Sequence, residues 1–85
     1  MRVSVIIPAF NEEKSIPYVL NDIPNFVNQV IVCDNSSTDK TSEIAKSFGA
    51  KVVYEKKRGY GNACLKAMTY LKSLKEKPEI VVFID

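Results

Sequence analysis

The chain has 85 residues, 46% of them hydrophobic and 26% charged, with 12 basic and 10 acidic side chains and a net charge of +2. This length allows one domain, the apolar fraction argues against intrinsic disorder, and the nearly balanced charge argues against a dedicated nucleic-acid binder. Because there is no histidine, these residues cannot form a Ser-His-Asp triad or a His-ligated zinc site.

The two cysteines, Cys33 and Cys64, lie far apart and form no C-x-x-C pair, which excludes a metal knuckle and a thioredoxin-like redox site. Both have apolar neighbours, so we expect small buried hydrophobic residues and no disulfide. No apolar run approaches the roughly 18 residues that a membrane span needs.

The first part of the chain predicts a strand, a helix and a second strand. Residues 3–7 are a β-branched run that ends before Pro8, which cannot donate a hydrogen bond to a strand ladder. Apolar side chains then recur at helical spacing over residues 16–23, with Pro17 in the first turn, where a helix tolerates proline. Residues 30–33 are a second apolar run and predict the second strand.

The middle of the chain predicts a second helix, a third strand and a third helix. Ser36 and Asp39 fit the S-x-x-D capping box of a helix start, and Gly49 fits the C′ position after the end of that helix. Residues 52–54 predict a short strand. Residues 62–74 carry apolar side chains at helical spacing and predict the third helix.

Residues 80–84, the most apolar run, predict a fourth strand, so that strands and helices alternate along the chain. We therefore expect an α/β fold, a three-layer Rossmann-like open parallel sheet with strand order 3-2-1-4, two helices on one face and one on the other. An apolar strand at the sheet edge and a face with a single helix suggest the N-terminal piece of something longer, unstable or self-associating by itself. A complete small domain, or one that pairs with a partner chain, is the alternative.

In such a sheet, ligands bind beyond the carboxyl ends of the strands, at the switch in strand order. The candidate site residues that follow the strands are Pro8, Ala9, Phe10, Asn11, Glu12, Asp34, Asp39, Arg58, Gly61 and Asp85. Carboxylates, an amide, an aromatic ring and cations on one edge are typical of a ligand site. The amides that open the third helix also suit an anion such as phosphate.

Each group also has a purely structural interpretation. Asp39 is equally well explained as a charge that caps a helix, and Lys57 and Arg58 as an ordinary solvated loop. Phe10 could simply be a residue of the hydrophobic core. Asp34 ends a buried strand, where a polar ligand explains it better than a turn does.

Two common nucleotide-binding motifs do not fit the chain. A dinucleotide-binding domain needs G-x-G-x-x-G directly after the first strand, but residues 8–12 read PAFNE, and a G-x-G occurs only at residues 59–61. A Walker A loop is absent from the sequence. An acidic residue after the fourth strand instead suits a divalent cation that bridges phosphates.

Four segments, in order, carry a family resemblance. Residues 5–13 (VIIPAFNEE) are similar to the P-x-[YF]-N-E signature of family-2 nucleotide-sugar glycosyltransferases, and residues 32–41 (VCDNSSTDKT) to their D-[DN]-[GS]-S-T-D-x-T segment. Residues 58–63 (RGYGNA) resemble the R-G-x-G-x-A loop of the dolichol-phosphate-mannose-synthase-like branch. Residues 81–85 (VVFID) resemble the strand that leads to the D-x-D motif. Asn35 stands where a second aspartate is common, which lowers the negative charge but keeps a hydrogen-bonding side chain.

The resemblance spans essentially the whole chain and implies that residues 1–85 are the nucleotide-sugar-binding N-terminal part of a GT-A glycosyltransferase domain. Gly61 would lie beside the donor pocket, and Asp85 would begin the D-x-D motif, which contacts the ribose and a Mg²⁺ or Mn²⁺ on the diphosphate. That motif is cut after its first residue here, so these 85 residues would hold only part of the metal site. The positions that surround the base and ribose of the donor are, in this chain, Pro8, Ala9, Asn11, Glu12 and Asp34.

The leading hypothesis is a metal-dependent enzyme that transfers a sugar from a nucleotide-diphosphate-sugar donor to a lipid phosphate or a saccharide. These residues would supply the donor-nucleotide site and be inactive alone, because the catalytic base and the acceptor site would lie beyond residue 85. The resemblance implies a cytoplasmic location. If later segments bind the membrane, the protein would lie at its cytoplasmic face. The alternative is a non-enzymatic α/β module that binds a small anion or a partner protein at the same sheet edge.

Overall fold

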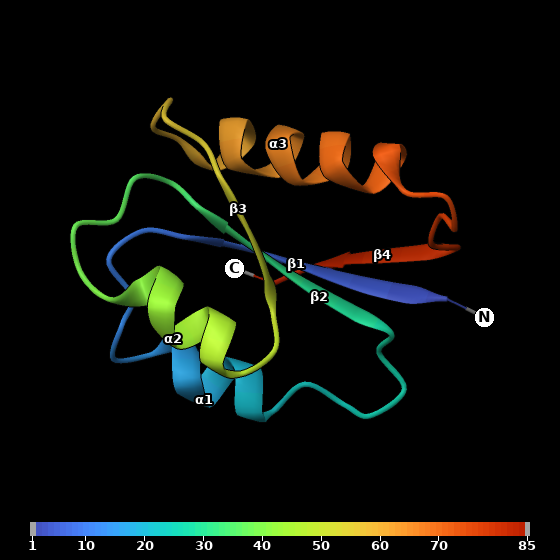
Figure 1. The fold of residues 1–85 in the computed structure, drawn as a ribbon, viewed down its shortest axis with the longest axis horizontal. Helices are drawn as coiled ribbons and strands as arrows, with labels where there is room; N and C mark the ends of the chain where they lie inside the picture. Colours follow the sequence, from blue (N-terminus) through green and yellow to red (C-terminus); the bar gives the residue numbers. More distant parts are fainter. Residues whose placement is uncertain (1, 85) are drawn as a thin grey trace.

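The apolar strands form an open parallel sheet, and the amphipathic helices that alternate with them cover its two faces (Figure 1). The computed structural model describes residues 2–84. The strand order is β3-β2-β1-β4 and all neighbouring strands are parallel, so the predicted α/β class and the 3-2-1-4 order are confirmed. The elements are β1 (Val3–Ala9), α1 (Ile16–Asn21), β2 (Gln29–Asp34), α2 (Thr41–Ser47), β3 (Lys51–Tyr54), α3 (Tyr60–Ser73) and β4 (Ile80–Phe83).

β1 continues through Pro8 to Ala9, two residues past the predicted end, and Pro8 pairs with Cys33 of β2. In a parallel ladder, alternate residues direct their backbone groups to opposite neighbours. Ile6 accepts a hydrogen bond from Ile84, so Pro8 faces the same side, beyond the last β1–β4 pair. A proline is tolerated in this central strand because its missing N–H points to the β4 side, past the last β1–β4 pair of the described residues.

The two faces of the sheet bury separate cores, because successive side chains of a strand point to opposite sides. In Figure 1, α1 and α2 lie below the sheet and α3 lies above it, which confirms the predicted two-and-one arrangement. The α1/α2 core contains Val5, Ile7, Ala9, Ile16, Val32, Ala45 and Val52. The α3 core contains Ile6, Ile31, Cys33, Val53, Ala63, Ala67 and Leu71.

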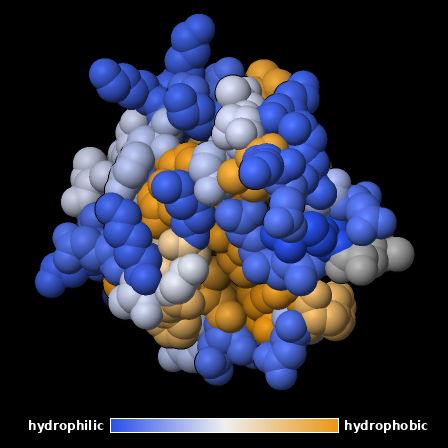
Figure 2. Space-filling view, turned by 45° about the vertical axis from the view of Figure 1, so that its right-hand side comes forward, coloured by the Kyte–Doolittle hydropathy of each residue, from blue (hydrophilic) through white to orange (hydrophobic). Residues whose placement is uncertain are grey.

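Apolar side chains of the edge strand β4 are exposed, whereas the strands beneath α3 are buried. Ile6 and Ile31 are fully buried beneath α3, because this helix packs across β1, β2 and β3. β4 pairs only with β1, and Ile80, Val82 and Phe83 are each 41–44% exposed. Figure 2 shows one side of the molecule, on which hydrophobic residues come to the surface between hydrophilic ones.

The predicted capping box of α2 is wrong. The helix begins at Thr41, and Ser36 lies in the preceding turn with a φ of +68°. The first helical amide, that of Thr41, donates instead to the Asp39 carboxylate at 3.0 Å. At the other end Gly49 has a φ of +86°, the left-handed conformation expected of a C′ glycine. Within residues 2–84, none of the helices has the length and apolarity of a membrane-crossing segment.

Candidate functional site

Three loops meet at the carboxyl edge of the sheet, on the left of Figure 1. They are the β1–α1, β2–α2 and β3–α3 loops. Backbone pairing continues beyond the strands, because the Asn35 N–H donates to the Ala9 carbonyl at 2.8 Å and the Glu55 N–H to the Asp34 carbonyl at 3.0 Å. These bonds hold the loops together at their bases, and their side chains can therefore form a shared site.

A pocket of about 240 Å³ lies at this edge, on the face of the sheet that α3 covers. Phe10 and Asn35 reach it because each lies two residues after a strand residue that faces α3, Pro8 in β1 and Cys33 in β2. We call it the edge pocket. Its lining residues are Pro8, Ala9, Phe10, Glu12, Asn35, Arg58, Gly59, Tyr60 and Ala63.

Arg58 and Phe10 form a stacked pair in the edge pocket. The guanidinium carbon of Arg58 lies 3.6 Å from the centre of the Phe10 ring, within the range of a cation–π interaction. Phe10 is half-buried, whereas Arg58 is exposed. The pair therefore offers a flat surface with a positive charge at the mouth of the pocket.

Asn35 joins the β2–α2 loop to the β3–α3 loop. Its Nδ2 donates to the carbonyl oxygens of Glu55 at 2.9 Å and Lys57 at 2.6 Å, and its Oδ1 accepts from the Gly59 N–H at 2.8 Å. Gly59 has a φ of +126°, a backbone conformation that residues other than glycine rarely adopt. This turn directs the chain from Arg58 into the first turn of α3.

Asn11 and Asp34 belong to a second cluster, on the α1/α2 side of the same edge. The side-chain oxygen of Asn11 accepts from the Thr38 N–H at 2.8 Å. The Asp34 carboxylate, only 4% exposed, accepts from the Ser37 N–H at 2.9 Å and from the Ser42 hydroxyl. We call this cluster the loop network, because it ties the β1–α1 loop to the start of α2.

Asp39 completes the loop network. Its carboxylate accepts from the Thr41 N–H and from the Glu13 N–H at 3.2 Å. Partial burial acts to raise the pKa of Asp39, but the hydrogen bonds from Thr41 and Glu13 outweigh it and hold that pKa below its usual value. The carboxylate is therefore ionised at neutral pH, where it fixes the approach to α2.

The predicted site residues thus fall into separate groups. Gly61 lies in the first turn of α3 and outside the pocket lining, and Asp85 lies outside the described residues. The residues that the edge pocket brings together are Pro8, Ala9, Phe10, Glu12 and Arg58. Those in the loop network are Asn11, Asp34 and Asp39.

Four lining residues are not among the predicted site residues, namely Asn35, Gly59, Tyr60 and Ala63. A signal for Asn35 was available, because the alternation along β2 places Cys33 and Asn35 on the face opposite Asp34. Gly59 and Tyr60 belong to the segment of residues 58–63 that resembles the R-G-x-G-x-A loop. Their place in the pocket depends on the conformation of the turn, which the spacing does not reveal.

No group of three or more His, Cys, Asp and Glu side chains that could hold a metal ion occurs within residues 2–84. Asp85, the residue predicted to bind one, is outside that range.

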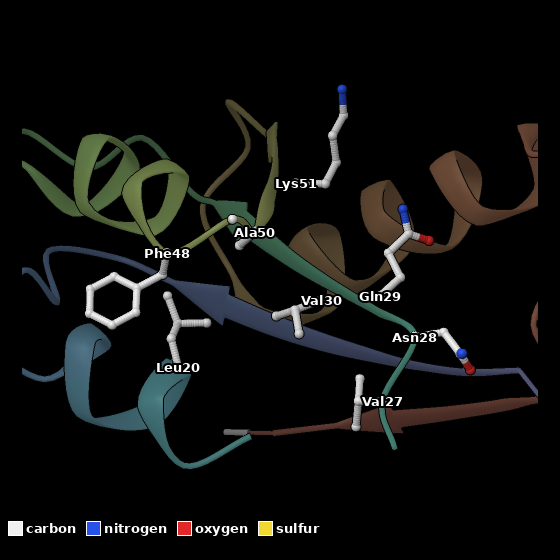
Figure 3. A pocket seen from close by; sticks show the side chains of 9 residues that line it. Leu20, Val27, Asn28, Gln29, Val30, Phe48, Ala50 and Lys51 are labelled. Atoms are coloured by element: carbon white, nitrogen blue, oxygen red, sulfur yellow. The ribbon is translucent and has the colours of Figure 1, made fainter. Parts of the chain in front are cut away.

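A second hollow, of about 230 Å³, lies at the opposite edge of the sheet (Figure 3). The apolar side chains of Leu20, Val30 and Phe48 gather around it, whereas the Lys51 side chain points away. The Asn28 side-chain oxygen is already engaged, since it accepts from the Val3 N–H at 2.6 Å. Convergent polar chemistry is thus found at the edge pocket and not here.

Comparison with known proteins places the chain among glycosyltransferases. Residues 4–85 match the family model described as Glycosyl transferase family 2. An uncharacterised glycosyltransferase of Mycobacterium bovis is 48% identical over 61 residues, which cover 72% of this chain and 28% of that protein. The 4,4'-diaponeurosporenoate glycosyltransferase of Staphylococcus haemolyticus is 38% identical over 92 residues, which cover 98% of this chain and 23% of that protein.

Solved structures share the fold. Glucosyl-3-phosphoglycerate synthase from Mycobacterium tuberculosis, in complex with Mn²⁺, UDP and glucosyl-3-phosphoglycerate, matches with a TM-score of 0.82 and 32% identity over 99% of this chain and 33% of that one. Other crystals of the same synthase hold Mg²⁺ with UDP, or Mn²⁺ with UDP-glucose. The chain therefore spans a quarter to a third of the length of the relatives described here.

Proposed function

The chain belongs to glycosyl transferase family 2, whose members are enzymes, and on that basis we propose that the edge pocket receives the nucleotide of a nucleotide-diphosphate-sugar donor. In the whole protein, the sugar would pass from this donor to an acceptor hydroxyl or phosphate. The residues proposed to surround the nucleotide are Pro8, Ala9, Phe10, Asn11, Glu12, Asp34, Asp39, Arg58, Gly61 and Asp85.

The observation that carries this proposal is the stack of Arg58 on Phe10 in the edge pocket. An aromatic ring can flank a base, and a guanidinium can bind phosphate oxygens with two parallel hydrogen bonds. A donor nucleotide carries both groups, a flat base and an anionic diphosphate. The pocket therefore matches the two chemical features that all such donors share.

The metal ion belongs to the same proposal. The similar synthase holds Mn²⁺ or Mg²⁺ together with UDP, which supports a divalent cation here, with Asp85 as the first of its ligands. Such a cation would neutralise charge on the diphosphate leaving group. Arg58 lies at the pocket mouth, where its charge would add to this effect.

The acceptor is proposed from the sequence resemblance. The R-G-x-G-x-A similarity of residues 58–63 favours the dolichol-phosphate-mannose-synthase-like branch, and with it a lipid phosphate, a saccharide being the other class. A cytoplasmic location, at the membrane face in the case of a lipid acceptor, accompanies that branch. These points rest on the motif, whereas the donor pocket rests on geometry.

Nucleotide titration of the whole protein tests the donor site. We expect UDP or GDP to bind in the presence of Mg²⁺ or Mn²⁺, measured by calorimetry. Arg58→Ala should weaken this binding about tenfold or more, and Arg58→Lys should lie between, because lysine keeps the charge but loses the planar fork. Arg2→Ala is the matched control, since Arg2 is exposed and its 3.5 Å pair with Glu76 is at the surface.

The result also separates the two candidate functions. If Arg58→Ala leaves the binding of both UDP and GDP unchanged, the edge pocket is not the donor site. A protein that binds neither nucleotide with either metal ion, but binds inorganic phosphate, would favour the non-enzymatic anion-binding module.

A further inference from the structure

We propose that Asn35 is a positioning residue that holds the β3–α3 loop, and with it Arg58, over the edge pocket, and that it can do so only as a neutral amide. This deepens the proposed function and rests on it for the role of Arg58. The claim that Asn35 holds the loop rests on the hydrogen bonds alone. The two parts can therefore be tested separately.

The orientation of the Asn35 amide follows from its partners. Two carbonyl oxygens, those of Glu55 and Lys57, approach one end of the amide at 2.9 and 2.6 Å, and the Gly59 N–H approaches the other at 2.8 Å. Only an NH₂ group can donate twice, and only an oxygen can accept from Gly59. In the flipped amide, the oxygen would face the two carbonyl oxygens and the NH₂ group would face the Gly59 N–H, so all three hydrogen bonds would be lost.

Asn35 is 6% exposed, whereas the loop that it binds is exposed at Lys56, Lys57 and Arg58. Apart from the stack of Arg58 on Phe10, these exposed side chains add little packing, so hydrogen bonds order most of this loop. The bonds to Lys57 and Gly59 fix the residues on both sides of Arg58. They therefore set the starting point of the Arg58 side chain, which lies 3.6 Å from the Phe10 ring.

An aspartate at position 35 would have the same shape but the wrong chemistry. An ionised carboxylate has no N–H to donate, so it would face the Glu55 and Lys57 carbonyl oxygens at hydrogen-bond distance with mutual repulsion. Only the contact with the Gly59 N–H would survive. Asparagine at this position is thus matched to the path of the loop, although the family motif commonly has aspartate there.

Protonation should partly restore an aspartate at this position, because a neutral carboxyl group can donate one hydrogen bond and accept another. The neighbouring charges act in both directions. Asp34, Glu55 and Glu12, which also lines the pocket, favour the neutral form, whereas Lys57 and Arg58 favour the ionised form. The two carbonyl oxygens, being closest, also favour the neutral form.

The first test uses trypsin, which cleaves after Lys56, Lys57 and Arg58. In the whole protein without nucleotide at pH 8, we expect Asn35→Asp to speed cleavage in this loop at least tenfold, as resolved by mass spectrometry. Asn25→Asp adds the same charge in an exposed loop between α1 and β2 and should leave the rate unchanged. A wild-type rate in N35D would overturn the proposal.

The second test compares UDP binding at pH 8 and pH 5.5, with the metal ion present. We expect N35D to bind about tenfold more weakly than the wild type at pH 8 and within about threefold at pH 5.5. A gap that does not narrow on acidification would overturn the requirement for a neutral group. If the wild type binds no UDP or GDP, the proposed function fails, but the trypsin result still decides the role of Asn35.

A third variant covers the case in which N35D does not fold, as judged by thermal melting. Asn35→Ser replaces the amide with a hydroxyl group, which can donate one hydrogen bond to one of the two carbonyl oxygens, and it adds no charge. We expect its loop to be cleaved at a rate several times that of the wild type. A wild-type rate in N35S would overturn the positioning role.

Discussion

Asp34 and Asn35 are neighbours in the sequence, but their side chains act on opposite faces of the sheet. Val32 belongs to the α1/α2 core and Cys33 to the α3 core, so the alternation continues past the end of β2. Asp34 accordingly binds Ser42 of α2, and Asn35 binds the loop that leads into α3. Two adjacent polar residues therefore organise two different helices.

Two substitutions at Asp34 separate its structural role from the predicted donor contact. Asp34→Ala removes the bonds to Ser37 and Ser42 and should cost about 1–3 kcal/mol of unfolding free energy. Asp34→Asn keeps an oxygen for Ser37 and can donate to the Ser42 hydroxyl, so its stability should stay within about 1 kcal/mol of wild type. Chemical denaturation measures both values.

UDP titration of Asp34→Asn then tests the donor contact without a loss of stability. A contact with the base should cost about 1–3 kcal/mol of binding. If this variant binds UDP with wild-type affinity, the role of Asp34 is purely structural.

Cys33 should make stability depend on alkaline pH. Burial, with smaller contributions from the carboxylates of Glu55 and Asp34, raises the pKa of its thiol from 9.0 to about 11. The unfolded chain loses this proton first, so the contribution is complete below pH 9 and is lost as the pH rises from 9 to 11. The loss amounts to about 3 kcal/mol at most.

Urea denaturation of the wild type and Cys33→Ala between pH 8 and pH 10.5 measures this effect. The alanine variant should be less stable throughout, because it leaves a cavity, but its stability should fall less steeply with pH. Parallel pH curves for the two proteins would contradict the assignment. Cys64, which is only half-buried, is the matched control as Cys64→Ala.

Among the elements, β4 is the least protected. Within residues 2–84, only β1 pairs with it, and Val82, opposite Val5, is 42% exposed although it faces the α1/α2 side. An apolar edge with free backbone groups is a template for another strand. The exposure of β4 on both faces means that its side chains, as well as its edge, are open to contact.

We therefore expect the 85-residue chain, produced by itself, to self-associate, and Val82→Lys to reduce this association several-fold. The added charge lies on the edge strand, where it opposes pairing between strands. Leu65→Lys, on the exposed side of α3, makes the same chemical change away from the sheet and should have little effect. Light scattering over a concentration series distinguishes these outcomes, and a monodisperse wild type would contradict the expectation.

At the scale of the whole molecule, the accessible surface is 5423 Å². A compact monomer of 9.5 kDa exposes about 5,000 Å². The excess agrees with a sheet whose last strand is not covered by a helix. The edge pocket is also a property of the whole fold, because Phe10, Asn35 and Arg58 come from three separate loops.

Apolar runs predicted the strands, and apolar periodicity together with helix start and stop signals predicted the helices, because these elements bury one face or both. The boundaries depended on tertiary features: Pro8 reads as the end of a strand, but its missing N–H matters only where a neighbour would accept it. Similarly, Ser36 and Asp39 have the spacing of a capping box, but the turn places Ser36 in the left-handed region, away from the helix start. Local spacing does not carry this information.

The candidate site was predictable in its location but not in its grouping. Asn35 forms its bonds with residues 20 to 24 positions away, and no local pattern encodes such contacts. The division between edge pocket and loop network follows from strand alternation, once the ends of β1 and β2 are known. A sequence reading that extended this alternation past each strand would have separated the two groups.

The pairing of β1 with β4 has a consequence for synthesis. Arg2 accepts hydrogen bonds from the amides of Glu79 and Ile80, and Ile6 accepts one from Ile84, so β1 is completed by a strand that the ribosome makes much later. At about 5–20 residues per second, a ribosome needs roughly 4–15 s to make the intervening segment. During that time one side of β1 is open on the nascent chain, and a strand of a neighbouring polypeptide can occupy it before β4 emerges.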